Sequence, residues 1–209
     1  MDKLIDELKQ FDKEACSVVS VSELQKAFSR LAPAFLYGGY IQVRTDYKIY
    51  IRTVEFYFHS EKENGVHDPI VYHRNGNGLV NVPYFPLMTL HSHDSGFDIT
   101  FESEQHEYRA SALIRGYEVK NNNMYLEWDK KSMFKAESTY KFNTQSLYLR
   151  KLLNGFALSD SNDIKWVDES RNQSLPIIEK NRRNVYQYDK EGNKVKCERL
   201  WSFTRVDQI

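Results

Sequence analysis

The sequence predicts one α+β domain over residues 1–209, with two helices in residues 1–35 and a sheet-rich body over 36–209. Three observations lead to this prediction. Apolar residues recur at helical spacing in the first 35 positions, and later ones alternate with a period of two. Aromatic residues make up 14% of the chain, and they favour pleated, half-buried strands. We expect a curved, mainly antiparallel sheet with helices near both ends.

Two helices are predicted at the start of the chain. The first carries apolar residues one helical turn apart, at Leu4, Ile5, Leu8 and Phe11. Ser20 and Glu23 have the spacing of a capping box that opens a second helix. Pro33 is expected to end this second helix, because proline lacks a backbone N–H.

Alternating residues predict a hairpin over 40–59 that turns at Thr45 and Asp46. In its longer strand Val54, Phe56 and Phe58 share one face. The opposite face therefore presents Glu55, Tyr57 and His59. Further strands are expected from Phe97 to Phe101 and over 112–119.

The remaining segments carry weaker patterns. Residues 60–96 are rich in Gly, Asn and Pro and predict loops. A short helix closed by Gly155 is expected over 147–155. Residues 158–182 are polar and weakly patterned, and two last strands, over 185–188 and 200–205, are expected to flank a turn at 191–193.

Composition limits the classes of function. The chain has 29 basic and 29 acidic residues, so it has no overall field to attract a polyanion. This argues against non-specific nucleic-acid binding by net charge and leaves a local basic patch open. Such a stretch occurs late in the chain, where it would either contact phosphates or form a solvated hairpin face. Its members are Lys180, Arg182, Arg183, Lys190, Lys194 and Lys196.

Cysteine usage and the first residues predict a cytoplasmic protein. Cys16 and Cys197 lie far apart, which fits neither a disulfide framework nor a zinc-binding spacing. The opening stretch is acidic and amphipathic and lacks the apolar core of a signal peptide. No run approaches 18 apolar residues, so we expect no membrane span. We also expect a monomer without a cofactor.

Two charged residues interrupt apolar strands, Asp98 in GFDITF and Arg115 in ALIRGYE. A pocket wall would explain them, and so would a structural ion pair between the two. A half-buried Asp98 near Arg115 would keep a low pKa and remain charged. The sequence leaves both explanations open.

A series of segments follows one order along the chain: PAFLYGGYIQV, RTVEFYFHSE, DPIVYHRNGNG, SGFDITFES, SALIRGYEV, LRKLLNGFALS and RLWSFTR. This order resembles the alkyladenine (3-methyladenine) DNA glycosylase family over roughly residues 26–205. The resemblance implies the fold shared by these glycosylases and formyltransferase C-terminal domains. It also implies hydrolysis of an N-glycosidic bond, with a damaged purine flipped into an aromatic pocket. In that reaction a carboxylate activates water, and negative charge stabilises an oxocarbenium-like transition state.

Carried over by position, the resemblance also marks departures from the family pattern. The first strand Glu of the family falls on Glu55, and the catalytic second Glu falls on Tyr57. The aromatic wedge that replaces a flipped base falls on Ser95. The remaining family positions, in the pocket and its strands, fall on His59, His73, Glu102 and Arg115.

The sequence therefore suggests replacements for the lost carboxylate. Asp98 or Glu55 would stabilise positive charge, although Glu55 could equally be an ion-paired strand residue. His73 or His93 would move the proton. The substrate-binding positions would be Arg115, Tyr57, His59 and Glu102.

Three functions follow from these residues. The first is a divergent glycosylase-like protein that binds, and in the stronger form hydrolyses, the N-glycosidic bond of a nucleoside or damaged base. Its partner would be DNA or a nucleoside-like small molecule, with no membrane. The second is a catalytically inactive ligand-binding module on the same scaffold. The third is a metal-dependent hydrolase that uses His91, His93 and Asp94, although loop histidines are more often capping or surface groups.

Overall fold

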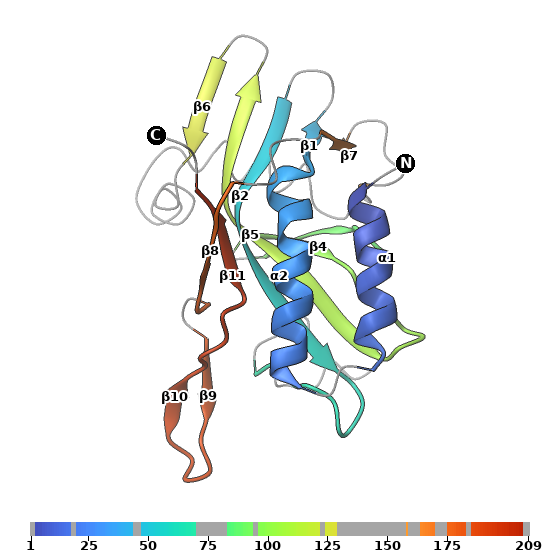
Figure 1. The fold of residues 1–209 in the computed structure, drawn as a ribbon, viewed down its shortest axis with the longest axis vertical. Coiled ribbons are helices and arrows are strands. Elements are labelled where there is room, and N and C mark those ends of the chain that lie inside the picture. The colour runs from blue at the N-terminus through green and yellow to red at the C-terminus, as the bar shows by residue number, and fades with distance from the viewer. Residues whose placement is uncertain are drawn as a thin grey trace.

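Two helices lie side by side against one face of a curled sheet (Figure 1). The computed structural model describes residues 3–17, 20–43, 47–69, 83–93, 96–121, 124–128, 158, 164–169, 175–182 and 185–206. Helix α1 spans Lys3–Ala15 and α2 spans Val21–Tyr37. The predicted apolar stripe of α1 is buried at Leu4, Leu8 and Phe11. Both hydrogen bonds of the capping box at Ser20 and Glu23 are present.

The prediction that Pro33 ends α2 is wrong, because the helix continues through it to Tyr37. Proline removes one backbone hydrogen bond. The residues beyond it, among them Phe35 and Leu36, are buried in the core and hold the last turn. The helix ends at Gly38, whose N–H donates to the Ala34 carbonyl at 3.1 Å.

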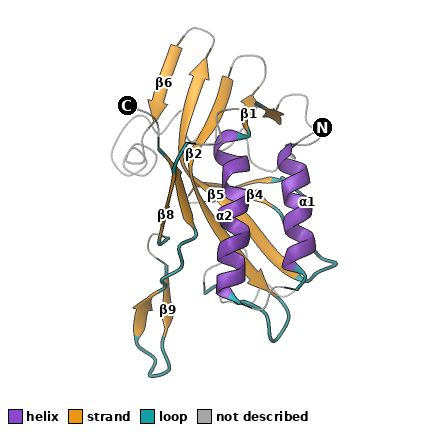
Figure 2. Ribbon diagram, viewed as in Figure 1, coloured by secondary structure: helices purple, strands orange, loops and turns teal. Residues whose placement is uncertain are grey.

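Nine of the eleven described strands form one sheet in which every pairing is antiparallel (Figure 2). Its main path runs β3-β4-β5-β2-β1-β7, while β6 pairs with β5, β11 with β2, and β8 with β11. The strands are β1 Gly39–Val43, β2 Tyr47–Ser60, β3 Leu90–His93, β4 Gly96–Thr100, β5 Tyr108–Asn121, β6 Met124–Trp128, β7 Ile164–Asp168, β8 Ile177–Lys180 and β11 Ser202–Arg205. The strong curl of this sheet gives a half-barrel. The α+β class and the antiparallel sheet are thus confirmed.

The core lies between the helices and the sheet. Phe56 is at its centre, with its ring stacked on Phe28 at a centroid distance of 4.6 Å. The rings of Phe35, Phe101 and Phe203 meet Phe56 edge-on. The predicted apolar face of the long strand is therefore the face that packs under the helices.

The last third of the chain differs from the prediction in two places. Strands β7 and β8 lie in residues 158–182, where the sequence pattern is weak. The two predicted last strands are present as β9 (Tyr186–Tyr188) and β11, but they do not pair across the turn at 191–193: β9 pairs with β10 (Lys194–Lys196), and β11 joins β2 and β8 in the main sheet. Trp201 and Phe203 are buried, so their burial draws this segment into the core. The helix expected over 147–155 falls outside the described residues.

A membrane-crossing helix would need greater length and hydropathy than any helix in the described part of the chain possesses.

Phe56→Ala should lower the free energy of unfolding by about 3–5 kcal/mol, because it leaves a cavity among packed rings. Urea denaturation followed by far-UV circular dichroism measures this change. Tyr188→Ala removes an exposed ring and should cost less than about 0.5 kcal/mol. Equal losses in the two variants would contradict the placement of Phe56 at the centre of the core.

Candidate functional site

Among the described residues predicted for the site, Glu55, Tyr57 and Asp98 lie on the sheet face that points away from the helices. Directly paired residues on neighbouring strands point to the same face. The register pairs His91 with Asp98, Asp98 with Leu113, and Leu113 with Glu55. These four residues therefore form one row across β3, β4, β5 and β2. We call the face that carries this row the polar face.

Two β-bulges interrupt the long β2–β5 pairing, and each places an arginine as the extra residue. The register passes from Ile51↔Tyr117 to Thr53↔Gly116, which leaves Arg52 over in β2. It then passes to Val54↔Ile114, which leaves Arg115 over in β5. A bulge bends its strand and re-aims the extra side chain, and bulges are common beside functional sites.

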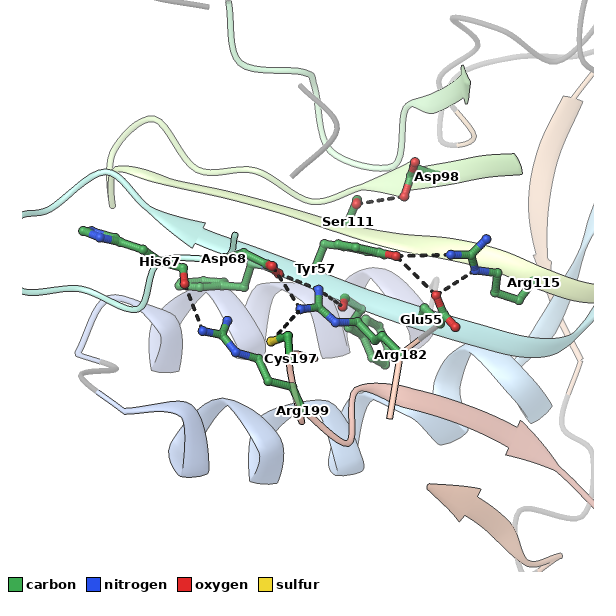
Figure 3. Close-up of polar contacts among 12 residues, drawn as sticks. Glu55, Tyr57, His67, Asp68, Asp98, Ser111, Arg115, Arg182, Cys197 and Arg199 are labelled. Carbon is green, nitrogen blue, oxygen red and sulfur yellow. Dashed lines mark hydrogen bonds and ion pairs between the residues drawn. The ribbon is translucent and has the colours of Figure 1, made fainter. Parts of the chain in front are cut away.

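The bulge at Arg115 brings three polar side chains together (Figure 3). Its Nε donates to Glu55 Oε2 at 2.7 Å, and its Nη2 lies 3.4 Å from the Tyr57 hydroxyl. The Tyr57 hydroxyl in turn donates to Glu55 Oε2 at 3.2 Å. The side chain of Arg115 is 12% exposed, whereas that of Glu55 is only 2% exposed. Arg115 is therefore the more accessible member of this pair.

The charges around Tyr57 act on its ionisation in opposite directions. Burial raises the pKa of the phenol, and the Glu55 and Asp98 carboxylates raise it further. Arg115 and Arg182 lower it, but the net pKa lies far above the ordinary value. Tyr57 therefore remains protonated at neutral pH and serves as a hydrogen-bond donor.

The guanidinium of Arg115 stays firmly charged in this setting. Burial lowers its pKa, whereas the nearby Glu55 carboxylate and the Tyr57 phenol raise it above the usual value. A buried carboxylate needs such a cation, because an unpaired buried charge is strongly destabilising.

Asp98 is completely buried, not half-buried as predicted. Its carboxylate accepts a hydrogen bond from Ser111 Oγ at 2.8 Å. The ion pair that the structure shows for Arg115 is with Glu55 on β2. The bulge leaves Arg115 as the extra residue opposite β2, the strand that carries Glu55.

A second buried ion pair, between Asp68 and Arg182, closes the other end of the polar face. Arg182 binds both carboxylate oxygens of Asp68, at 2.6 and 3.0 Å. Its guanidinium lies over the rings of Tyr57 and Trp201, at 4.6 and 4.8 Å from their centroids. Arg182 is therefore part neither of a phosphate-binding surface nor of a solvated hairpin face, the two alternatives for this basic stretch. No sequence pattern predicts this pair, whose members lie 114 residues apart.

Two predicted ligand-binding residues have partners within the protein. The His59 ring stacks on the ring of His67 at a centroid distance of 5.1 Å. Glu102 binds Arg109 Nη1 at 3.0 Å and accepts a hydrogen bond from the Phe85 backbone at 2.9 Å. These contacts give Glu102 a structural role beside the site.

Other predicted residues lie wholly or partly outside the described part of the chain. His73, Asp94 and Ser95 fall among residues that are not described, as does the side chain of His93. The His91 ring packs against Phe85 at a centroid distance of 5.1 Å. Within the described ranges, no group of three or more His, Cys, Asp or Glu is placed to hold a metal ion. The proton-moving histidine and the His91/His93/Asp94 metal cluster stay predictions.

Raising the pH above about 10 should destabilise the protein, because unfolded tyrosine ionises near that pH. Burial, with Glu55 and Asp12 nearby, raises the pKa of Tyr57 and Tyr108 respectively, so the folded phenols keep their protons. Their contribution to stability is therefore complete below pH 10 and declines as the pH rises beyond it. Each of the two phenols should lower the free energy of unfolding by about 1.4 kcal/mol per pH unit in that range.

Urea unfolding of wild type and Tyr57→Phe between pH 8 and pH 11 measures this decline, which should be shallower in the variant. Tyr188→Phe is the matched control, because its ring is exposed. The same slope in Tyr57→Phe as in wild type would contradict the raised pKa of Tyr57.

A scan against protein-family models finds no match for this sequence, and a search among curated proteins finds none either. The likeness to the 3-methyladenine DNA glycosylase family therefore rests on the order and spacing of sequence segments. The structure adds the α+β class, the curled antiparallel sheet, and the polar face with two bulges in the β2–β5 pairing.

Proposed function

We propose that the protein is a divergent relative of the 3-methyladenine DNA glycosylases that binds a nucleobase or nucleoside on the polar face of its sheet. The single observation that carries the proposal is the β5 bulge, which turns Arg115 toward Glu55 and Tyr57. Two helices packed on a strongly curled antiparallel sheet support the scaffold implied by the resemblance.

The chemistry of the polar face suits a planar, neutral and polar ligand. The charged groups placed on the polar face are three carboxylates, Glu55, Asp68 and Asp98, and two guanidiniums, Arg115 and Arg182. This set gives no preference for an anion. Carboxylates accept hydrogen bonds from amino groups, and guanidiniums donate to ring nitrogens and carbonyl oxygens. Nucleobases carry both kinds of group on one edge.

Arg115 is the side chain through which we expect a ligand to be recognised. Its planar fork of donors suits a flat ligand edge and stacks readily on aromatic rings. Glu55 and Tyr57 hold it in place from behind. Asp98 is completely buried and would act on the ligand through its charge.

Hydrolysis of an N-glycosidic bond is the second candidate function. Glu55 and Asp98 lie in one row with only Leu113 between them, so their charges flank one position on the sheet. Negative charge placed in this way favours an oxocarbenium-like transition state. Against this stands Tyr57 at the family's catalytic position. Its raised pKa keeps it protonated, so it cannot activate water at neutral pH. Binding is therefore the better supported function.

Thermal unfolding with 3-methyladenine, hypoxanthine, adenine and inosine tests the binding proposal. A ligand at 100 times its dissociation constant stabilises by about 2.7 kcal/mol, which should raise Tm by about 5 °C or more. Arg115→Gln should abolish this rise, because it removes the ligand-facing donors.

Arg52→Gln is the matched control. It changes the other bulge arginine, whose partner Glu118 keeps Arg205 as a second cation. This variant should keep the full response to the ligand. No response to any of the four compounds, or an equal loss in both variants, would refute the binding site.

Release of free base from oligonucleotides with hypoxanthine or 3-methyladenine separates binding from hydrolysis. The binding proposal expects no release above the rate without protein. Release that Asp98→Asn abolishes while folding is retained would instead establish the hydrolytic function.

A further inference from the structure

The hairpin of β9 and β10 forms its own two-stranded sheet and extends away from the body of the molecule (Figures 1 and 2). Its turn is closed by backbone hydrogen bonds from Asp189 to Asn193 and from Gly192 to Asp189. The Asp189 carboxylate also accepts from the backbone N–H groups of Glu191 and Asn193. Gly192 has φ +82°, a conformation that favours glycine. The turn is therefore defined by its own residues.

One face of this hairpin gathers two tyrosines and two lysines. The register pairs Tyr186 with Lys196 and Tyr188 with Lys194. Opposed residues share a face. Consistent with this, Lys194 Nζ lies 4.7 Å from the centroid of the Tyr186 ring. The residues between them, such as Gln187, point to the other face. We call the face with the four side chains the Tyr–Lys face.

The exposure of this face calls for an explanation. Tyr188 is 75% exposed, the highest value among the large hydrophobic side chains of the described residues, and Tyr186 is 41% exposed. Their spacing along the strand is about 6.7 Å, twice the rise per residue. Two exposed rings at this spacing suit neighbouring bases of an extended strand.

We propose that the Tyr–Lys face binds single-stranded nucleic acid, with bases stacked on Tyr186 and Tyr188 and phosphates held by Lys194 and Lys196. Aromatic rings beside a cationic row are the two elements that sequence-tolerant binding of single strands requires. A base in a closed duplex is already stacked on its neighbours, so the rings favour an unpaired strand. The inference rests on the hairpin and does not require a ligand at the polar face.

The position of the lysines on the hairpin, and not its net charge, supports a polyanion as the ligand. Residues 185–198 hold three lysines and three acidic residues. Two lysines lie on the Tyr–Lys face, whereas Asp189 is bound into the turn. Two phosphate contacts should give a slope of about −1.4 for log K against log salt on a single strand.

Fluorescence anisotropy with labelled oligothymidylate at several salt concentrations tests the proposal on the full chain. Tyr188→Ala should weaken binding about tenfold, because it removes one stacking ring. Lys194→Ala with Lys196→Ala should weaken binding and flatten the salt slope toward zero. All three side chains are exposed, so the variants should fold, and thermal unfolding checks this.

Three controls accompany these variants. Gln187→Ala changes the other face of the hairpin, and Lys165→Ala removes an exposed lysine from β7; both should bind as wild type. Arg52→Gln, which changes the bulge arginine that the nucleobase proposal does not use, should also leave oligonucleotide affinity unchanged.

Absence of binding at low salt, or a loss in the controls equal to that in Tyr188→Ala, would overturn the proposal. Equal competition by polyglutamate with no effect of Tyr188→Ala would also overturn it and would assign the face to acidic polypeptides.

Discussion

The pairing of β2 with β5 is the constraint on which the rest of the structure depends. Its regular part gives the sheet an apolar face that packs under the helices and a polar face on the other side. Its two bulges supply an arginine to each of two buried carboxylates, Glu55 and Glu118. An unpaired buried carboxylate would be strongly destabilising. The two bulges that interrupt the β2–β5 pairing therefore also supply the cations that allow Glu55 and Glu118 to be buried.

Strand parity made much of this arrangement predictable. A period of two places Glu55 and Tyr57 on one face of β2 and Phe56 on the other. As expected, Phe56 packs in the core under the helices. The partners of the charges were not predictable in the same way. A bulge shifts the register by one residue and has no local signal in the sequence. The pairing of Arg115 with Glu55 is therefore seen only in the folded structure. Asp68 and Arg182 meet only through the folded chain.

The fold shows the same division between local and distant causes. The capping box at Ser20 acts within one helical turn, so the sequence alone reveals it. The prediction from Pro33 fails because burial of the residues that follow it outweighs the tendency of proline to end a helix. The prediction for residues 200–205 fails for a related reason, because Trp201 is buried in the core and the strand that follows it joins the main sheet. Tertiary packing decides wherever local signals are weak.

The two buried ion pairs of the polar face differ in exposure. The side chains of Asp68 and Arg182 are completely buried, and Arg182 also contacts the backbone of β2. The side chain of Arg115 remains 12% exposed in its pair with Glu55. Well-packed apolar residues could stabilise the fold as well as a buried ion pair does, so stability alone does not explain either pair. Val185 and Cys197, at the base of the β9–β10 hairpin, pack on Tyr57 and Leu113. The base of that hairpin therefore lies beside the polar face, so the segment that carries the Tyr–Lys face is anchored through Tyr57 and Leu113.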